Sequence, residues 1–305
     1  MTATGRDGAA TDDVVRGLGL MIVAMLIAPG IDGFAKFLAQ SMVPTQVVWA
    51  RYLFQVLFLA APLLLLRRPL VIRRWPLHVA RGLLMAAALL LFVSALRVMP
   101  LADAIAVFFV EPFILTLISV AFLGERIGWH RLAAIAVGFA GAMVVVQPSY
   151  AVIGLPALFP LGAAVCFAAY LALTRSLAIG EDAMMLQFTT GLTACAVTTV
   201  ALAVGHFAEV AELTPRWPSA FEWLLMAGMG AIGTVAHVMM VYAFRHAPAG
   251  ILAPFQYLEI IGATLIGLAV FGDFPTATTW FGVAMIVGSG LYVFHRERRL
   301  ARATI

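Results

Sequence analysis

Ten apolar runs, each long enough to cross a bilayer, follow one another through nearly the whole chain and decide its fold class. A transmembrane helix needs about 20 predominantly apolar residues. The runs cover residues 17–38, 44–66, 77–97, 100–123, 129–147, 154–178, 183–205, 220–244, 249–271 and 277–295. Prolines and short polar turns separate them, as helix breakers should. The sequence therefore predicts an all-α polytopic membrane protein with ten transmembrane helices.

The composition excludes a soluble globular protein. Hydrophobic residues make up 63% of the chain and charged residues 11%, whereas a soluble domain carries roughly 25% charged residues. The net charge of +4 does not indicate nucleic-acid binding, because the basic residues cluster between the apolar runs. Cys166 and Cys195 lie in apolar runs without CxxC spacing, so neither a disulfide nor a metal site is expected.

Arginine residues lie mostly on one side of the predicted helices, and this asymmetry sets the orientation. That side carries Arg67, Arg68, Arg73, Arg74, Arg126, Arg131, Arg175, Arg245, Arg296, Arg298, Arg299 and Arg302. The opposite side has little beyond Lys36, Arg97 and Arg216, with Glu209, Glu212 and Asp273. Because cytoplasmic loops carry the excess of Lys and Arg, both termini are predicted to be cytoplasmic.

The two ends of the chain are polar and are predicted to lie outside the membrane region. Residues 1–16 carry charges of both signs and are predicted to form a disordered cytoplasmic tail, while residues 296–305 are predicted to form a basic cytoplasmic tail. The N-terminal residues lack the basic region and cleavage site of a signal peptide, so the first apolar run is expected to be retained.

The segment that begins at Ala95 is repeated, without a gap, from Ala243. The first copy reads ALRVMPLADAIAVFFVEPFILTLISVAFLGER and the second AFRHAPAGILAPFQYLEIIGATLIGLAVFGDF. The repeats are predicted to span residues 17–148 and 149–295. Each contains five helices, an odd number, so the second enters the membrane from the opposite side. This is the inverted-repeat layout of secondary transporters.

The repeat aligns Glu111 with Glu259, and both lie near the middle of a predicted helix. A charge inside an apolar helix is costly and usually marks a functional site. Phe108 shares a helical face with Glu111, and Gln256 and Tyr257 accompany Glu259. Such a face suits a site that holds an apolar body and a polar head. Burial favours the neutral carboxylic acid, which makes protons a candidate coupling ion. The alternative is a hydrogen-bonded glutamic acid that ties helices together.

A second group of charges occupies the first two predicted helices. Asp32 and Lys36 are spaced for a local salt bridge, and Arg51 lies at a similar depth as a second partner for Asp32. We expect these three residues to form a gating or structural ion-pair network, with direct substrate contact as the alternative. His237 and Tyr170 are further candidates for lining the site, although a histidine inside a helix also serves as a helix–helix hydrogen bond.

Sequence signatures of enzymes are missing. The chain has no HExxH, P-loop, GxGxxG after a strand, or GxSxG motif. The sequence therefore predicts a protein that is not an enzyme and that uses no cofactor or metal.

Four segments resemble the drug/metabolite transporter superfamily, specifically its EamA-type permeases. They are WARYLFQ (49–55), ALRVMPLADA (95–104), EPFILTLISVAFLGERIG (111–128) and GFAGAMVVVQP (138–148). The resemblance implies a central cavity lined by the first, third, fourth, sixth, eighth and ninth helices, with the fifth and tenth at the periphery. It also implies transport of metabolites such as amino acids across the bacterial inner membrane, often outward.

The leading hypothesis is a secondary transporter, and an exporter, of small organic metabolites that works by alternating access. One alternative is an uptake permease for a metabolite such as S-adenosylmethionine. Another is a membrane-embedded enzyme acting on lipid-linked substrates. The expected partners are the small-molecule substrate and the lipid bilayer, with no nucleic acid, and the oligomeric state is expected to be a monomer or a homodimer.

Overall fold

The computed structural model describes residues 3–65, 74–123, 128–177, 182–247, 252 and 255–303. Within these ranges the regular structure is entirely helical, and nine helices are long and apolar enough to cross a membrane. A shorter apolar helix, Leu258–Phe271, supplies the tenth. These elements confirm the predicted all-α membrane protein. The predicted cytoplasmic residues Arg67, Arg68, Arg73 and Arg126, and the start of the predicted helix 249–271, lie outside the described residues.

The first half of the chain forms seven helices. They are α1 (Ala3–Ile27), α2 (Pro29–Ala39), α3 (Pro44–Leu65), α4 (Trp75–Leu96), α5 (Leu101–Phe108), α6 (Glu111–Leu123) and α7 (Trp129–Ile153). The described part of the second half contains η1 (Leu155–Leu158), α8 (Phe159–Leu177), α9 (Ala183–Phe207), α10 (Ala220–His246), α12 (Leu258–Ile266), the π-helical turn η2 (Gly267–Phe271) and α13 (Ala277–Ala303).

Two of the predicted helices are broken near their middles, in both cases at a proline. A proline has no N–H to donate, and its ring clashes with the carbonyl four residues earlier. Pro29 separates α1 from α2. Pro112 follows Phe108 by four residues, so a continuous helix would bring its ring against the Phe108 carbonyl. α5 ends at Phe108, and α6 begins at Glu111. The first break places Asp32 just after a helix start, and the second places Glu111 at one.

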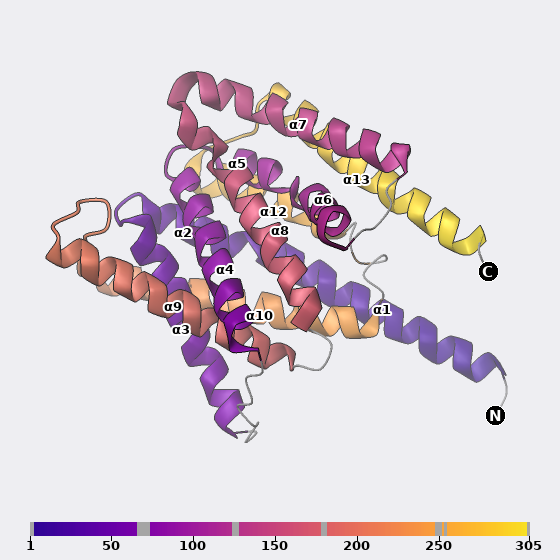
Figure 1. Ribbon diagram of the computed structural model, residues 1–305, viewed down its shortest axis with the longest axis horizontal. Coiled ribbons are helices and arrows are strands. Elements are labelled where there is room, and N and C mark those ends of the chain that lie inside the picture. Colours follow the sequence, from indigo (N-terminus) through magenta and orange to yellow (C-terminus); the bar gives the residue numbers. More distant parts are fainter. Residues whose placement is uncertain are drawn as a thin grey trace.

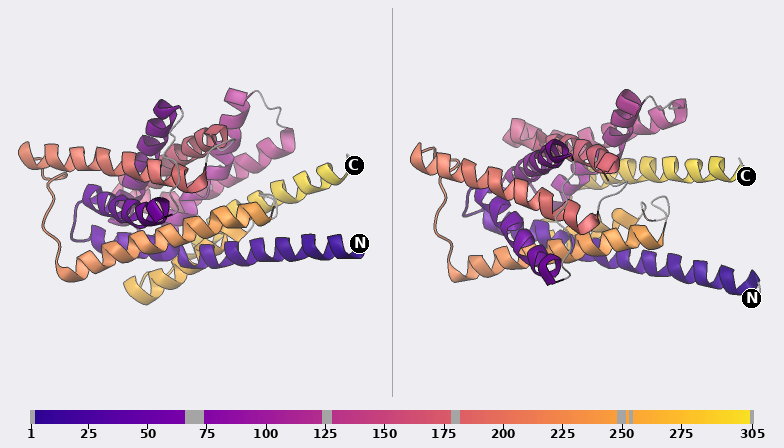
Figure 2. Two further views of the ribbon diagram at one scale, coloured as in Figure 1. Left: turned by 90° about the horizontal axis from the view of Figure 1, so that it is seen from below. Right: turned by 60° about the horizontal axis from the view of Figure 1, so that its bottom comes forward.

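The two chain ends differ from the prediction. α1 begins at Ala3, where a disordered tail is expected, and α13 continues to Ala303, through most of the predicted basic tail. No proline interrupts either segment, and alanine, leucine and arginine are good helix formers. A membrane helix that meets no stop signal can therefore extend past the bilayer. Figures 1 and 2 show both termini at one end of the molecule and the loop between α9 and α10 at the other.

The helices α7 and α13 lie side by side along one edge of the molecule (Figure 1). Small residues allow this close packing: a Cβ atom on Gly282 would lie 2.6 Å from the carbonyl oxygen of Gly141. The remaining helices surround the interior, where α2 packs on α10 and α12, α3 on α9 and α10, and α4 on α8 and α9. These contacts bring the charged residues of the two repeats together.

Candidate functional site

Asp32 lies on α2 of the first repeat and Glu259 on α12 of the second, and these two helices pack against each other. Glycines set the approach: a Cβ on Gly262 would lie 2.6 Å from Cγ of Pro29, and one on Gly33 would lie 2.8 Å from Ile266. The two carboxyl groups are close enough to act on each other electrostatically. The repeat led us to associate Glu259 with Glu111, but the acid that acts on Glu259 is Asp32.

Neither of these two carboxyl groups has a close polar partner among the described residues. In the part of the chain that the structure describes, Asp32 and Glu259 form no hydrogen bond and no ion pair within 4.0 Å. Both side chains are half-buried. Ionisable groups inside a membrane protein usually pair with one another or line a pathway. Two acids on packed helices, with no partner in the described part of the chain, can accept a cation, a proton or a donor group of a substrate.

Arg51 on α3 is the positive charge that acts on Asp32. Its side chain is 3% exposed, and its guanidinium group rests on Gly233 of α10, where a Cβ atom would lie 2.7 Å from Cζ. Nη1 donates to Oε1 of Gln55 at 2.8 Å, and Gln55 donates to the carbonyl oxygen of Gln187 at 3.2 Å. Arg51 is thus held by its neighbours near Asp32 without forming a direct ion pair with it.

His237 lies one helical turn after Gly233 and interacts electrostatically with Arg51. Its Nδ1 is 2.8 Å from the carbonyl oxygen of Gly233. Because a carbonyl only accepts, Nδ1 carries the proton in this hydrogen bond. The geometry is that of a histidine whose ring is fixed by its own helix, with Nε2 left for other contacts.

Lys36 does not pair with Asp32, although the two are spaced for a helical salt bridge. Its Nζ lies 2.5 Å from Oδ2 of Asp273 and 4.7 Å from the ring centroid of Phe271. Gly272, with φ of 71°, ends η2 in a left-handed conformation that turns Asp273 back. The expectation of a local Asp32–Lys36 pair is therefore wrong, because Lys36 pairs with Asp273, which is distant in sequence.

Glu111 belongs to a separate cluster. It is 8% exposed and interacts electrostatically with Tyr257, whose ring packs against Phe109 at 5.4 Å between centroids. The Tyr257 hydroxyl reaches α13, where a Cβ atom on Gly290 would lie 1.9 Å from it. Tyr257 therefore points toward the edge helix α13. Gln256, next to it, is half-buried.

A row of aromatic rings continues from the predicted site residue Phe108. Successive centroids are 5.5 Å apart for Phe92 and Phe108, 5.3 Å for Phe108 and Phe167, and 5.5 Å for Phe167 and Tyr170. The rings come from α4, α5 and α8. They form a continuous row of packed rings that ends at Tyr170.

Two buried charged residues escaped the sequence analysis. Arg81 on α4 is 1% exposed, and Asp103 on α5 is 7% exposed and accepts a hydrogen bond from Thr279 at 3.0 Å. Each lies within a predicted membrane helix, and this alone is a signal of function. The sequence analysis selected charges that the repeat aligns or that lie near another charge. Arg81 and Asp103 meet neither condition, so they were not selected. In the described residues, no group of three or more His, Cys, Asp or Glu could hold a metal ion.

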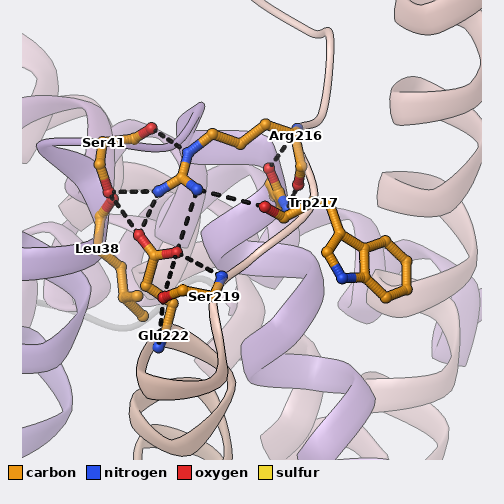
Figure 3. Close-up of polar contacts among 7 residues, drawn as sticks. Leu38, Ser41, Arg216, Trp217, Ser219 and Glu222 are labelled. Atoms are coloured by element: carbon orange, nitrogen blue, oxygen red, sulfur yellow. Dashed lines mark hydrogen bonds and ion pairs between the residues drawn. The ribbon is translucent and has the colours of Figure 1, made fainter.

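A polar cluster (Figure 3) joins the turn after α2 to the loop between α9 and α10. That loop lies at the end opposite the termini (Figure 1). Arg216 donates to both carboxylate oxygens of Glu222, and to the carbonyl and hydroxyl oxygens of Ser41 at 2.7 and 2.9 Å. Ser219 and Glu222 form a capping box that begins α10. The turn after α2 is thereby fixed to the loop before α10, which holds the site helices α2 and α10 in register.

Comparisons with known proteins match this architecture. The riboflavin transporter of Rhizobium johnstonii is 32% identical over 213 residues, which cover 68% of this chain and 66% of that protein. The S-adenosylmethionine uptake transporter of Rickettsia felis is 26% identical over 204 residues, 67% of this chain and 66% of that protein. The matched region thus spans just under two thirds of these relatives.

A crystal structure of another protein shares the fold, with a TM-score of 0.63 at 20% sequence identity over 90% of this chain and 95% of the other. The model of the EamA-like transporter family matches twice, at residues 15–147 and 154–294. The chain is therefore a multi-pass membrane protein that belongs to the EamA-like transporter family.

Proposed function

We propose that this protein is a secondary transporter that moves small organic metabolites by alternating access around Asp32 and Glu259. The observation that carries the proposal is that these two acids, one from each repeat, lie on helices packed against each other and have no polar partner among the described residues. Transporters built from inverted repeats place their binding sites where the repeats face each other. The family and the names of the relatives point to transport rather than to an enzyme.

The charges at the site suggest what the acids bind. When both are ionised, Asp32 and Glu259 carry two negative charges, and Arg51 offsets one of them. One uncompensated negative charge remains, which suits one proton or one cationic group of a substrate. Loading and release of that charge would change the repulsion between α2 and α12. This coupling is how we expect binding to favour one side of the membrane over the other.

The aromatic row indicates the kind of substrate. Riboflavin and S-adenosylmethionine, the solutes named for the relatives, both contain a planar heteroaromatic ring. Aromatic rings with centroids about 4.5–7 Å apart attract each other in offset or edge-to-face geometry, as Phe108, Phe167 and Tyr170 do here. We propose that a ring of the solute packs against this row. We therefore propose a substrate with a planar ring and a polar or charged arm. Amino acids with aromatic side chains also fit this description.

The proposed setting is the bacterial inner membrane with both termini in the cytoplasm. Both termini lie at one end of the molecule (Figures 1 and 2), which supports it. The nine membrane-length helices and the shorter apolar helix Leu258–Phe271 agree with this arrangement if the shorter helix also crosses the membrane. Export is the proposed direction, with uptake as the alternative. The same alternating-access cycle serves both, and the gradient that is coupled to it sets the direction.

Proteoliposomes containing the purified full-length chain test the proposal. They are incubated with a soluble bacterial metabolite extract supplemented with riboflavin and S-adenosylmethionine, and their contents are analysed by mass spectrometry. We expect at least one metabolite to enter and to show counterflow, and to do so less in vesicles with Glu259→Gln. Equal contents in protein-containing and empty vesicles would contradict a transporter. Covalent conversion of a solute or lipid would favour the enzyme alternative.

A further inference from the structure

Arg81 is a buried charge whose protein partners are all neutral. Its Nε donates to Oγ1 of Thr174 at 2.9 Å, Nη1 to the carbonyl oxygen of Leu186 at 3.4 Å, and Nη2 to the Tyr170 hydroxyl at 3.4 Å. Its Cζ lies 5.1 Å from the Tyr170 ring centroid. Among the described residues, no carboxylate lies within ion-pair distance of it. A buried charge without a counter-charge is strongly unfavourable, so an anion from outside the protein would stabilise this site.

Tyr52 supplies a second and independent sign of a missing ligand. Its side chain is 1% exposed, and its hydroxyl has no hydrogen-bond partner among the described residues. A buried hydroxyl without a partner is rare in native proteins. Its ring centroid lies 5.6 Å from Cζ of Arg51, which donates to Gln55. Gln55 in turn donates to the carbonyl oxygen of Gln187, the residue next to the Leu186 carbonyl that Arg81 contacts. Tyr52 is thus connected to Arg81 through adjacent residues of α9.

The balance of charge favours a monoanion. Asp32 offsets the charge of Arg51 electrostatically, whereas the contacts of Arg81 supply no negative charge. One positive charge is thus left over, which matches a carboxylate better than a doubly charged phosphate. Arginine also binds a carboxylate through two parallel hydrogen bonds. The aromatic row ends at Tyr170, so a ring stacked along it would place an acidic arm beside Arg81.

We propose that Arg81, Tyr170 and Tyr52 form a subsite for a carboxylate group of the transported solute, separate from the acidic pair Asp32 and Glu259. This inference rests on the proposed transport function and deepens it. The substrate would then carry an anionic group and a cationic or protonated group, joined to a planar ring. The anionic group of such a solute would bind at Arg81, and its cationic or protonated group would bind at Asp32 and Glu259.

The test is a pair of ring compounds that differ only in charge. Benzoate and benzamide share a planar ring and nearly the same size. Thermal unfolding of the detergent-solubilised full-length protein is measured as each compound is titrated, at constant ionic strength. We expect benzoate to stabilise the wild type at a concentration about tenfold lower than benzamide, the advantage of a charge-assisted hydrogen bond. Arg81→Gln should abolish this preference and leave the effect of benzamide unchanged.

Two further variants guard against misfolding and nonspecific charge effects. Tyr52→Phe removes the unpartnered hydroxyl, so we expect it to fold at least as well as the wild type while the benzoate preference shrinks. Arg97→Gln removes the same charge at an exposed position and should retain the full preference.

Equal stabilisation by benzoate and benzamide in the wild type, no stabilisation by either, or an unchanged preference in both Arg81→Gln and Tyr52→Phe, would overturn the subsite. Because the readout is binding, the preference can hold even if the vesicles show no transport. That result would contradict the proposed function alone.

Discussion

Lys36 donates to Asp273 across 2.5 Å and thereby joins α2 of the first repeat to the turn after η2 in the second. Lys36 is 6% exposed, and Asp103 acts on it electrostatically from α5. Lys36 follows Asp32 by one turn along α2, toward the contact of Ser41 with Arg216 in the α9–α10 loop. That loop lies at the end opposite the termini (Figure 1). We expect the two repeats to separate here when a passage opens from Asp32 and Glu259 to that side. We therefore expect this ion pair to act as a latch on that side.

The first prediction concerns the latch. Asp273→Asn leaves the buried ammonium group of Lys36 without its main counter-charge. Because the Asp273 side chain is 35% exposed, we expect a loss of about 1–3 kcal/mol in stability, below that of a fully buried pair. Adding Lys36→Met should recover most of that loss, since no buried charge then remains. Thermal unfolding is measured for Asp273→Asn, Lys36→Met and the double variant. If the pair does not contribute to stability, the losses of the two single variants will add in the double variant.

The second prediction uses two glycines. Gly233→Ala would place a Cβ atom 2.7 Å from Cζ of Arg51, whereas nothing lies within 4 Å of a Cβ on Gly288. Replacing glycine by alanine inside a helix stabilises it by up to about 1 kcal/mol. We expect Gly288→Ala to be neutral or stabilising with normal transport. Gly233→Ala should displace Arg51 and reduce transport at least severalfold. Equal flux in the two variants would show that the position of Arg51 does not matter.

The third prediction concerns the coupling of Asp32 to Arg51. If the two charges offset each other, Asp32→Asn with Arg51→Gln should lower transport less than the product of the two single effects. The physical reason is that either single change leaves one buried charge without its opposite. Independent losses that multiply in the double variant would instead indicate that one of the two contacts the substrate directly.

The fourth prediction is the topology. Reporter fusions after residues 72 and 299 should both report the cytoplasm, and a fusion after residue 212 should report the opposite side. The basic loops set this orientation, and the α9–α10 loop lies at the end away from both termini (Figure 1). A cytoplasmic signal at residue 212 is incompatible with an inverted repeat of five helices.

Much of the fold could be predicted from the sequence, because membrane helices depend on local apolar length. Each predicted helix corresponds to one apolar run that is visible in the sequence by itself. The family resemblance comes from four short segments. The breaks at Pro29 and Pro112 were less evident, since membrane helices can continue through a proline. The helical extensions at Ala3 and Ala303 carry no apolar signal and so look like tails.

The candidate site was harder to predict, because its pairs connect residues far apart in the chain. Spacing along one helix suggested Lys36 as the partner of Asp32, but the turn at Gly272 brings Asp273 to Lys36. Symmetry suggested that Glu111 and Glu259 are equivalent, yet the groups that interact with them electrostatically differ, Tyr257 for Glu111 and Asp32 for Glu259. The repeats therefore share a fold while their side chains have diverged.

The central claim is that Asp32 and Glu259 form the binding and coupling centre, and Glu259→Gln tests it most directly. Glutamine keeps the size and removes the titratable group, so we expect normal insertion and stability. Flux of the solute identified in proteoliposomes is measured between pH 5 and 8 for the wild type, Glu259→Gln and, as the symmetry-matched control, Glu111→Gln. We predict that Glu259→Gln lowers flux at least about tenfold, the effect expected for loss of a charge-assisted contact, and flattens its dependence on pH. Glu111→Gln should have the smaller effect on both. Wild-type flux with an unchanged pH profile in Glu259→Gln would contradict the account.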